Sequence, residues 1–214
     1  MSKLNIYLAQ INTIVGDLEG NSKKILEEFQ NAQKNQVDLI IFCEMAITGY
    51  PAEDLWLKKY FIEDANEEIK KIIKATIGSK CAILLGVPYI LNYKKNDKIY
   101  NSAFLIEGGE VKKIMSKKTL PNYGVFDEKR YFSAENFLSF FEFRGQTLSL
   151  LICEDIWDLK NLYLLQEQVF DCVISINSSP YSSGKYQYRR SIAKNFVKHL
   201  KKPLIYLNQI GGQD

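Results

Sequence analysis

The sequence predicts a single α/β domain, and three features of the chain support this. Short apolar runs typical of buried strands recur along the 214 residues, and amphipathic helical segments separate several of them. Two glycine-containing turns join other apolar runs as hairpins. Strand-helix-strand succession indicates a parallel sheet covered by helices. With no internal repeat or linker, residues 1–214 are expected to form one domain.

The amino-terminal segment is predicted to form a strand, a helix and a second strand. The first strand is expected over Leu4–Ile11 and the second over Asp38–Phe42. Asn21 is the expected cap of the helix, which should reach about Gln33. Its apolar face consists of Ile25, Leu26, Phe29 and Ala32. This face should pack on the sheet.

The middle of the chain is predicted to add a helix, a strand and a hairpin. Glu53–Trp56 is expected to form a loop or short turn before the helix. The apolar positions of this helix recur at helical spacing and are Ile62, Ala65, Ile69, Ile72 and Ile73. A strand follows over Cys81–Val87. Two strand-like runs between residues 98 and 116 flank Glu107-Gly108-Gly109, which is a hairpin signal.

The carboxyl-terminal half is predicted to begin with a second hairpin, in which Arg144-Gly145-Gln146 joins residues 137–143 to 147–152. Asp158 or Asn161 is then expected to cap a helix reaching Phe170. Strands are expected over residues 172–176 and 204–207. The helix between them carries one apolar face, formed by Ile192, Phe196, Val197 and Leu200.

Composition excludes several classes of protein. Hydrophobic residues at 46% and charged residues at 25% are ordinary for a globular domain, and the net charge is only +3. The lysines fall in scattered pairs (Lys94-Lys95, Lys112-Lys113, Lys201-Lys202), which disfavours a nucleic-acid-binding protein. Without a signal peptide or a bilayer-spanning run, we expect a cytoplasmic protein that binds no membrane.

The four cysteines are widely spaced and the chain has one histidine. This pattern favours reduced thiols over a disulfide framework and does not match a zinc site, so no metal is expected. The histidine, His199, lies at the basic end of a predicted helix. There it is expected to interact with helix carbonyls or with solvent rather than to act as a catalytic base.

Three reactive residues stand where predicted strands end. Cys153 and Glu44 each follow a buried strand, and Lys117 precedes a turn stopped by proline. Taken singly, each has a plainer interpretation. A cysteine is commonly a small buried apolar residue, Glu44 a polar strand terminus, and Lys117 a surface lysine. A nucleophile, an acid and a cation at separate strand ends together indicate a site for acyl transfer.

The order of these residues and the motifs around them resemble the nitrilase, or carbon-nitrogen hydrolase, superfamily. The details are similar to the glutaminase (amidotransferase) domain of glutamine-dependent NAD synthetase. The matching stretches are Ala9–Asn12, Val15–Asp17, Glu44 with Thr48–Pro51, Leu120–Glu128, Cys153–Trp157 and Asn177–Tyr181. The resemblance spans the whole chain. It implies a four-layer αββα sandwich, an arrangement that periodicity alone cannot establish.

The resemblance also implies roles. Cys153 would attack the side-chain amide of glutamine, Glu44 would accept and return the proton, and Lys117 would stabilise the oxyanion with the backbone amide of Glu154. The lysine matched is Lys117 rather than its neighbour Lys118.

The remaining roles concern the substrate. Tyr123 and Phe126 resemble residues of the glutamine pocket, and Glu154 and Ser179 resemble groups that hold the α-amino and carboxylate ends. Glu128 resembles a buried carboxylate that positions the lysine and the substrate. Each of these residues also has a simpler interpretation as packing, loop polarity or an ordinary salt bridge.

The resemblance further implies a chain that is incomplete at its carboxyl end and lacks the synthetase domain. ATP and magnesium would bind only to that domain, and no phosphate-binding glycine loop of the P-loop type is present here. The expected partners are glutamine, the synthetase domain and further copies in a homo-oligomer. The alternatives are a stand-alone amidase acting on another small amide and a non-catalytic scaffold subunit.

Overall fold

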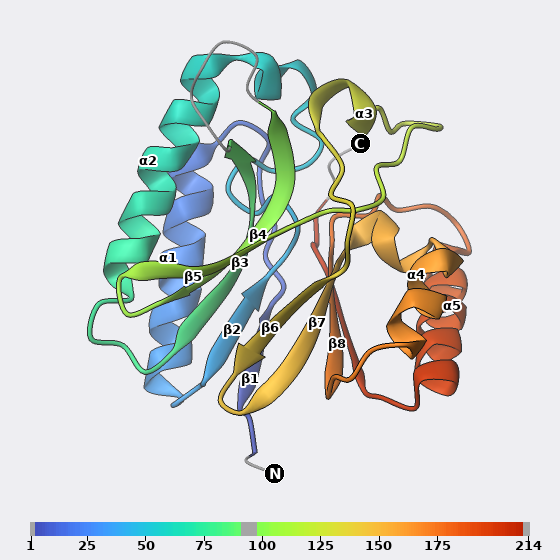
Figure 1. Cartoon of the computed structure of the whole chain (residues 1–214). Coiled ribbons are helices and arrows are strands. Elements are labelled where there is room, and N and C mark those ends of the chain that lie inside the picture. The colour runs from blue at the N-terminus through green and yellow to red at the C-terminus, as the bar shows by residue number, and fades with distance from the viewer. Residues whose placement is uncertain (1–2, 91–97, 212–214) are drawn as a thin grey trace.

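The computed structural model describes residues 3–90 and 98–211, which form two β-sheets with helices on their outer sides (Figure 1). The Met1-Ser2 start, the Lys94-Lys95 pair and the residues after Gly211 lie outside the described part. Among the helices that are described, none offers an apolar stretch sufficient to span a bilayer.

The first sheet has five strands in sequence order. They are β1 (Ile6–Ala9), β2 (Leu39–Phe42), β3 (Ala82–Ile90), β4 (Ile99–Glu107) and β5 (Glu110–Ser116). The first three are parallel, and β4 and β5 are antiparallel to their neighbours. The β4–β5 hairpin forms as predicted, because Gly108 and Gly109 supply the positive φ angles (62° and 85°) that a tight two-residue loop needs.

The second sheet has four strands. They are β6 (Ser139–Phe143), β7 (Gln146–Ile152), β8 (Cys172–Asn177) and β9 (Leu204–Asn208). The predicted β6–β7 hairpin closes through Arg144 and Gly145, again both at positive φ, and β7, β8 and β9 are parallel. Parallel strands present their carboxyl ends at one edge of a sheet, so the residues after β7 and β8 meet there.

Helices cover the outer face of each sheet. The described helices are α1 (Leu18–Lys34), α2 (Lys59–Ala75), α3 (Glu128–Tyr131), α4 (Leu159–Gln166) and α5 (Lys185–Leu200), with short 3₁₀ helices η1 (Glu53–Leu57) and η2 (Cys153–Ile156). In Figure 1, α1 and α2 lie beside the first sheet and α4 and α5 beside the second. The arrangement has four layers.

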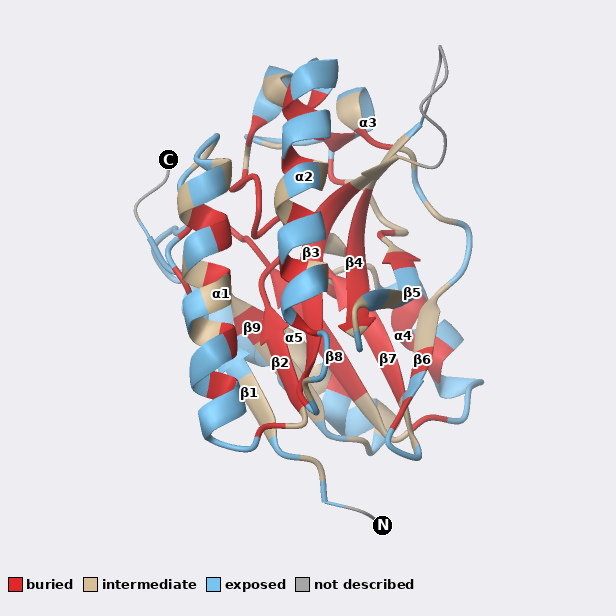
Figure 2. Ribbon diagram, turned by 90° about the vertical axis from the view of Figure 1, so that its left-hand side faces the viewer, coloured by how far each residue is buried: buried red, intermediate tan, exposed pale blue. Residues whose placement is uncertain are grey.

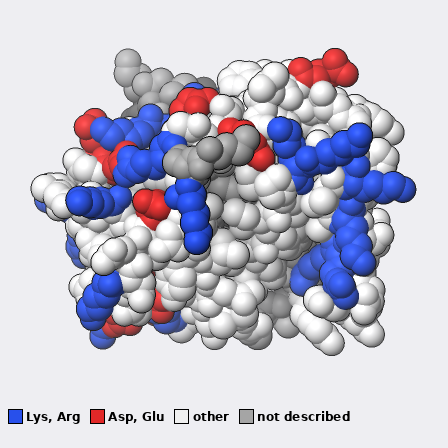
Figure 3. All heavy atoms as spheres, turned by 90° about the horizontal axis from the view of Figure 1, so that it is seen from below, with Lys and Arg blue, Asp and Glu red and all other residues white. Residues whose placement is uncertain are grey.

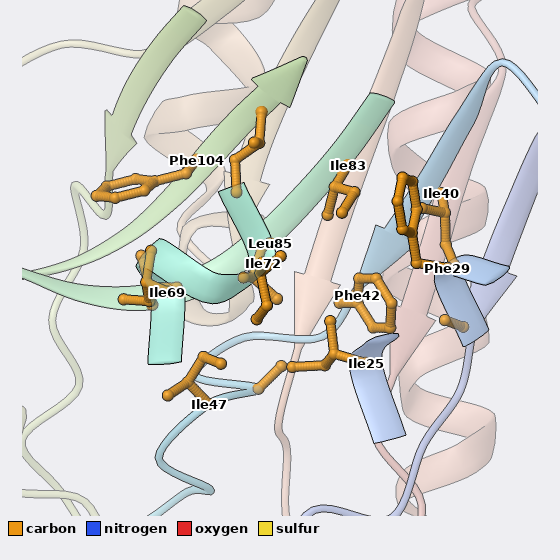
Figure 4. Packing of buried hydrophobic residues seen from close by; sticks show 14 of the residues in the cluster. Ile25, Phe29, Ile40, Phe42, Ile47, Ile69, Ile72, Ile83, Leu85 and Phe104 are labelled. Atoms are coloured by element: carbon orange, nitrogen blue, oxygen red, sulfur yellow. The ribbon is translucent and has the colours of Figure 1, made fainter. Parts of the chain in front are cut away.

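Side-chain alternation along the strands explains the layers. In β2, Ile40 and Phe42 pack with Ile25 and Phe29 of α1 (Figure 4), whereas the intervening positions point toward the second sheet. The core between the sheets includes Ile41 from the first sheet and residues of β6, β7, β8 and β9 from the second. Figure 2 shows the inner strands buried and the outward helix faces exposed. The expected αββα sandwich is therefore confirmed.

The prediction that Asn21 caps α1 was wrong. Asp17 is the cap, and its carboxylate accepts from the backbone N–H of Gly20 at 2.9 Å. Asn21 lies inside the helix and is fully buried. It bonds both backbone groups of Ile14 and donates to the carbonyl of Ile47, so it fixes two loops instead.

Three smaller expectations also need correction. The first strand is shorter than predicted, and α4 ends before Phe170, whose ring is nevertheless buried. Val197 is 41% exposed, whereas Phe196 is buried against the second sheet. Neighbouring helical positions are 100° apart, so in α5 the direction that buries Phe196 leaves Val197 at the edge of the apolar face.

Basic side chains occur on both sides of the molecule, but along one side few acidic side chains accompany them. Figure 3 shows Lys and Arg side chains along the edge occupied in Figure 1 by α4 and α5. Helix α5 contributes five basic residues and no acidic one: Lys185, Arg189, Arg190, Lys194 and Lys198. The scattered lysine pairs in the sequence gave no indication of this concentration.

Candidate functional site

Glu44 lies just beyond β2, with 1% of its surface exposed. Its Oε1 accepts hydrogen bonds from Nδ2 of Asn101 at 2.7 Å and from Nζ of Lys117 at 2.8 Å. Its Oε2 accepts from the backbone N–H of Ser178 at 3.0 Å. Since Ser178 follows β8, the carboxylate is held by donors from both sheets and its orientation is fixed.

Gly86 of β3 allows the turn that presents Glu44 to lie close to the sheet. A Cβ at this position would be 2.3 Å from the carbonyl oxygen of Cys43 and 2.7 Å from Cα of Glu44. The carbonyl of Gly86 accepts from the backbone N–H of Ala46 at 2.9 Å. Glycine is therefore the residue that fits, and it sets the height of Glu44 above the sheet.

Lys117 follows β5 and is fully buried. Its Nζ lies 2.8 Å from Oε1 of Glu44 and 2.7 Å from Oε1 of Glu128, which also accepts from the Tyr50 hydroxyl at 2.8 Å. Burial alone would lower the pKa of Lys117, but Glu128 and Glu44 outweigh it and raise that pKa well above its usual value. The amine is therefore held as an ammonium ion.

Glu128 shares this ammonium ion with Glu44. Burial raises the pKa of Glu128 to about 7, since the lowering effect of Lys117 is partly opposed by the charge of Glu44. One cation thus serves two buried carboxylates. We refer to Glu44, Lys117 and Glu128 as the buried ionic cluster.

Cys153 begins η2 with a φ angle of 47°, in the left-handed region that few side chains adopt. Its Sγ lies 3.6 Å from Oγ of Ser179, which follows β8. Burial raises the pKa of the thiol above its usual value, the charge of Glu44 adds to this effect and the charge of Lys117 opposes it. The resting thiol is therefore protonated, and its use as a nucleophile requires a base.

A cavity of about 510 Å³ opens beside Cys153. Its wall includes the aromatic rings of Tyr123 and Phe126 and the side chains of Glu154 and Lys185. The Tyr123 hydroxyl donates to the Glu154 carboxylate at 3.0 and 3.1 Å. Among the described residues in the wall, Glu154 is the only acid and Lys185 the only base. The cavity therefore offers one site for each sign of charge.

Lys185 is the first residue of α5 and is oriented by aromatic rings. Its Nζ lies 6.0 Å from the ring centroid of Phe126 and 5.9 Å from that of Trp157. The Trp157 ring packs in turn on Tyr188, with 5.0 Å between their centroids. Cation–π contacts at this distance hold a lysine head without neutralising it, so the ammonium group stays available to a ligand.

Comparison with known proteins identifies the family of this chain. The model of the carbon-nitrogen hydrolase family matches residues 6–214. The chain belongs to the carbon-nitrogen hydrolase family. A glutamine-dependent NAD(+) synthetase of Acinetobacter baylyi is 37% identical over the whole chain, and one from Synechocystis is 35% identical over 98% of it.

Solved structures agree with this assignment. A glutamine-dependent NAD+ synthetase from Acinetobacter baumannii superposes with a TM-score of 0.89 at 36% identity, over 98% of this chain and 39% of that one. An amidase from Nesterenkonia shares the fold, with a TM-score of 0.77 at 20% identity over 98% of this chain and 80% of that one. The chain spans about 36–40% of the length of the curated synthetases that it matches, and it is homologous to their glutaminase part.

In this member of the carbon-nitrogen hydrolase family, the predicted site residues fall into two groups. Glu44, Lys117 and Glu128 form the buried ionic cluster and do not line the cavity. The residues predicted at the reacting end and in the pocket line the cavity wall, and they are Tyr123, Phe126, Cys153, Glu154 and Ser179. The charges of Glu44 and Lys117 act on the Cys153 thiol, which connects the two groups.

Sequence reasoning missed four residues at this site. Asn101 and Ser178 hold Glu44, Asp155 joins two loops, and Lys185 lines the cavity. Ser178 and Asp155 lie inside the matching stretches Asn177–Tyr181 and Cys153–Trp157. Their position in these motifs could have identified them, although their residue types alone could not. Asn101 lies within a strand and Lys185 among other basic residues, and neither is distinguishable from the sequence.

The single histidine lies apart from these groups. Nδ1 of His199 is 2.9 Å from the carbonyl oxygen of Asn195, one turn earlier in α5, and the side chain is exposed. Within residues 3–90 and 98–211, the acidic, cysteine and histidine side chains form no cluster of three suited to a metal ion.

Proposed function

We propose that this domain hydrolyses the side-chain amide of glutamine and releases ammonia. Cys153 is the nucleophile, Glu44 the general base and Lys117 the cation that stabilises the oxyanion. The observation that carries the proposal is the meeting of the buried Glu44–Lys117 ion pair, 2.8 Å between Oε1 and Nζ, with a cysteine in the wall of a cavity. A base, a cation and a thiol are the groups that amide hydrolysis through cysteine requires.

The reaction proceeds in two halves. Glu44 accepts the proton of Cys153 as sulfur attacks the amide carbon, and Lys117 and the backbone N–H of Glu154 stabilise the tetrahedral oxyanion. Glu44 then delivers the proton to the departing nitrogen, so ammonia leaves and a γ-glutamyl thioester remains. Water, deprotonated by Glu44, attacks the thioester and gives glutamate, and the thiol regains its proton.

The charges in the cavity favour an amino acid over a neutral amide. Glu154 suits the α-ammonium group and Lys185 the α-carboxylate, while Tyr123 and Phe126 enclose the aliphatic part. Ser179 lies near the thiol and offers a hydroxyl to the substrate. A stand-alone amidase acting on an uncharged amide would have no use for this pair of charges.

In a longer protein of the kind the matched relatives represent, the ammonia would pass to a synthetase domain that uses ATP and magnesium to convert deamido-NAD to NAD. Such a protein would be cytoplasmic and homo-oligomeric. Cys153→Ala in that protein should abolish NAD synthesis from glutamine and leave synthesis from added ammonium. A variant that still used glutamine would contradict the assignment of the nucleophile.

The direct test compares amides. We expect ammonia release from glutamine to exceed release from asparagine and propionamide, because only glutamine meets both the charges and the length of the cavity. Lys117→Met should abolish release, whereas Lys118→Met should retain it, because the Lys118 ammonium group points away to the carbonyl of Asn136. Faster hydrolysis of propionamide than of glutamine would favour the stand-alone amidase. No release from any amide would favour the scaffold.

A further inference from the structure

Asp155 joins the two segments that carry Lys117 and Cys153. Its Oδ1 accepts from the backbone N–H of Lys118 at 3.1 Å and of Thr119 at 2.6 Å. Its Oδ2 accepts from the backbone N–H of Ile152 at 2.9 Å. Lys118 directly follows Lys117, and Ile152 directly precedes Cys153. One carboxylate therefore joins the two sheets. It binds the segment after β5 of the first sheet, which carries Lys117, and the end of β7 of the second sheet, which leads into Cys153.

The chemistry of these contacts calls for a carboxylate. Asp155 is 3% exposed, and all three of its carboxylate hydrogen bonds come from main-chain N–H groups. An asparagine in its place would turn an NH₂ group toward at least one of these donors, and a buried donor facing a donor costs roughly 1–3 kcal/mol. The site thus distinguishes a carboxylate from an amide of the same shape.

A second buried side chain supports the same junction. Nδ2 of Asn161, in α4, donates to the carbonyl oxygen of Asp155 at 2.9 Å and to Oγ1 of Thr119 at 3.2 Å. The backbone of Lys117 is fixed on its other side, where its N–H donates to the carbonyl of Asn101 at 2.8 Å. The lysine backbone is therefore held from both sheets.

We propose that Asp155 is a positioning residue that sets the separation between the Lys117 ammonium group and the Cys153 thiol. This inference rests on the proposed function of those two residues. A displacement of about 1 Å in a reacting group costs on the order of 10²-fold in rate. Loss of the Asp155 bonds is therefore expected to lower the rate of the chemical step more than substrate binding.

The test compares Asp155→Asn with Asp171→Asn in the otherwise unchanged protein. Asp171 is the matched control, because its carboxylate accepts from the backbone N–H of Thr147 at 2.8 Å at the opposite end of β7. Two quantities are measured: kcat and KM for glutamine, and the pH profile of Cys153 alkylation by iodoacetamide, followed by peptide mass spectrometry. Asp155→Asn should lower kcat about 10- to 100-fold with a smaller change in KM and shift the alkylation profile. Asp171→Asn should do neither.

The outcomes separate this inference from the proposed function. If the Asp155→Asn variant shows a shifted alkylation profile but the wild-type protein does not hydrolyse glutamine, the role of Asp155 is retained and the proposed function is rejected. Normal wild-type hydrolysis with an Asp155→Asn variant that behaves like Asp171→Asn would overturn the role of Asp155. If Asp155→Asn does not fold, Asn161→Ala replaces it. A smaller fall in kcat with a shifted profile supports the inference, and an unchanged kcat and profile overturns it.

Discussion

The ends of β2 and β7 carry the same pattern, an apolar strand followed by cysteine and glutamate, yet only the glutamate of the first pair belongs to the site, whereas both members of the second do. After β2, Cys43 is fully buried between the sheets and Glu44 joins the buried ionic cluster. After β7, Cys153 and Glu154 both line the cavity. The backbone reverses at Met45 in the first case and at Cys153 itself in the second, with φ angles of 50° and 47°.

In this comparison, the place of the reversal decides which cysteine reaches the cavity wall. A reversal two residues after the cysteine lets the strand continue, and Cys43 stays in the core with a pKa that burial raises to about 12. A reversal at the cysteine leaves the side chain at the border of the core, where Cys153 is buried yet also lines the cavity. Residue type alone would make either cysteine a candidate nucleophile.

Exchanging each cysteine for alanine should give the largest difference. Cys153→Ala is expected to lower glutamine hydrolysis by at least about 10³-fold, because removal of a nucleophile leaves only binding and electrostatic contributions. Cys43→Ala should leave hydrolysis nearly unchanged and lower the free energy of unfolding by about 1 kcal/mol. Ammonia release and urea denaturation measure the two effects. Equal losses of activity would refute the distinction between the strand ends.

The two glutamates should also differ, and Glu44→Gln has the larger effect. Its amide cannot accept the thiol proton, so kcat is expected to fall roughly 10²- to 10⁴-fold while KM changes little. Steady-state kinetics with glutamine provide the measurement. A variant that retained kcat and raised KM would mean that Glu44 binds substrate rather than carrying a proton.

Glu154→Gln should affect binding instead. Loss of the negative charge that faces the α-ammonium group is expected to raise KM roughly 10- to 100-fold, the equivalent of about 1.5–3 kcal/mol for a charged hydrogen bond. Tyr123→Phe, which removes only the hydroxyl that orients Glu154, is the matched control and should raise KM less. A Glu154→Gln variant with lowered kcat and unchanged KM would contradict this assignment.

A third glutamate, Glu128, belongs to the β2 side of this comparison, because it shares Lys117 with Glu44. Its pKa of about 7 lies above the ordinary value of a glutamate, so between about pH 4.5 and 7 the folded protein retains a proton that the unfolded chain releases. This contribution to stability is complete below about pH 4.5 and is lost as pH rises to 7. Its size is up to roughly 3 kcal/mol.

Glu128→Gln should therefore flatten the fall in unfolding free energy over that pH range. Denaturation in urea at several pH values measures the slope. Part of the slope should remain, because burial also raises the pKa of Asp155, to about 6. An unchanged slope in the variant would show that Glu128 is ionised across the whole range.

Sequence patterns predicted the elements well where periodicity and turn chemistry agree. The glycines of both hairpins and the apolar faces of α1 and α2 identified their elements, because local geometry dictates these residues. Asn21 was misassigned because its residue type suits a cap, while its actual contacts, to Ile14 and Ile47, are set by tertiary structure. The stacking of the two sheets was predicted from the resemblance alone.

The site was predictable only as far as its motifs reached. Glu44 and Cys153 were found because each ends an apolar run, and Lys117 because it ends a predicted strand and matches the resemblance. The complete burial of Lys117 was not predicted. Asn101 could not be found, since its contact with Glu44 joins residues 57 positions apart. Such contacts depend on how strands from distant parts of the chain are brought together.

Covalent labelling of the thiols tests the central claim most directly. The protein is incubated with a glutamine analogue that carries a diazoketone in place of the amide, and peptide mass spectrometry locates the adduct. We predict one adduct on Cys153, none on Cys43, and protection by excess glutamine. An adduct on Cys43, or complete labelling that glutamine does not slow, would contradict the claim that the backbone reversal at Cys153 makes it the nucleophile.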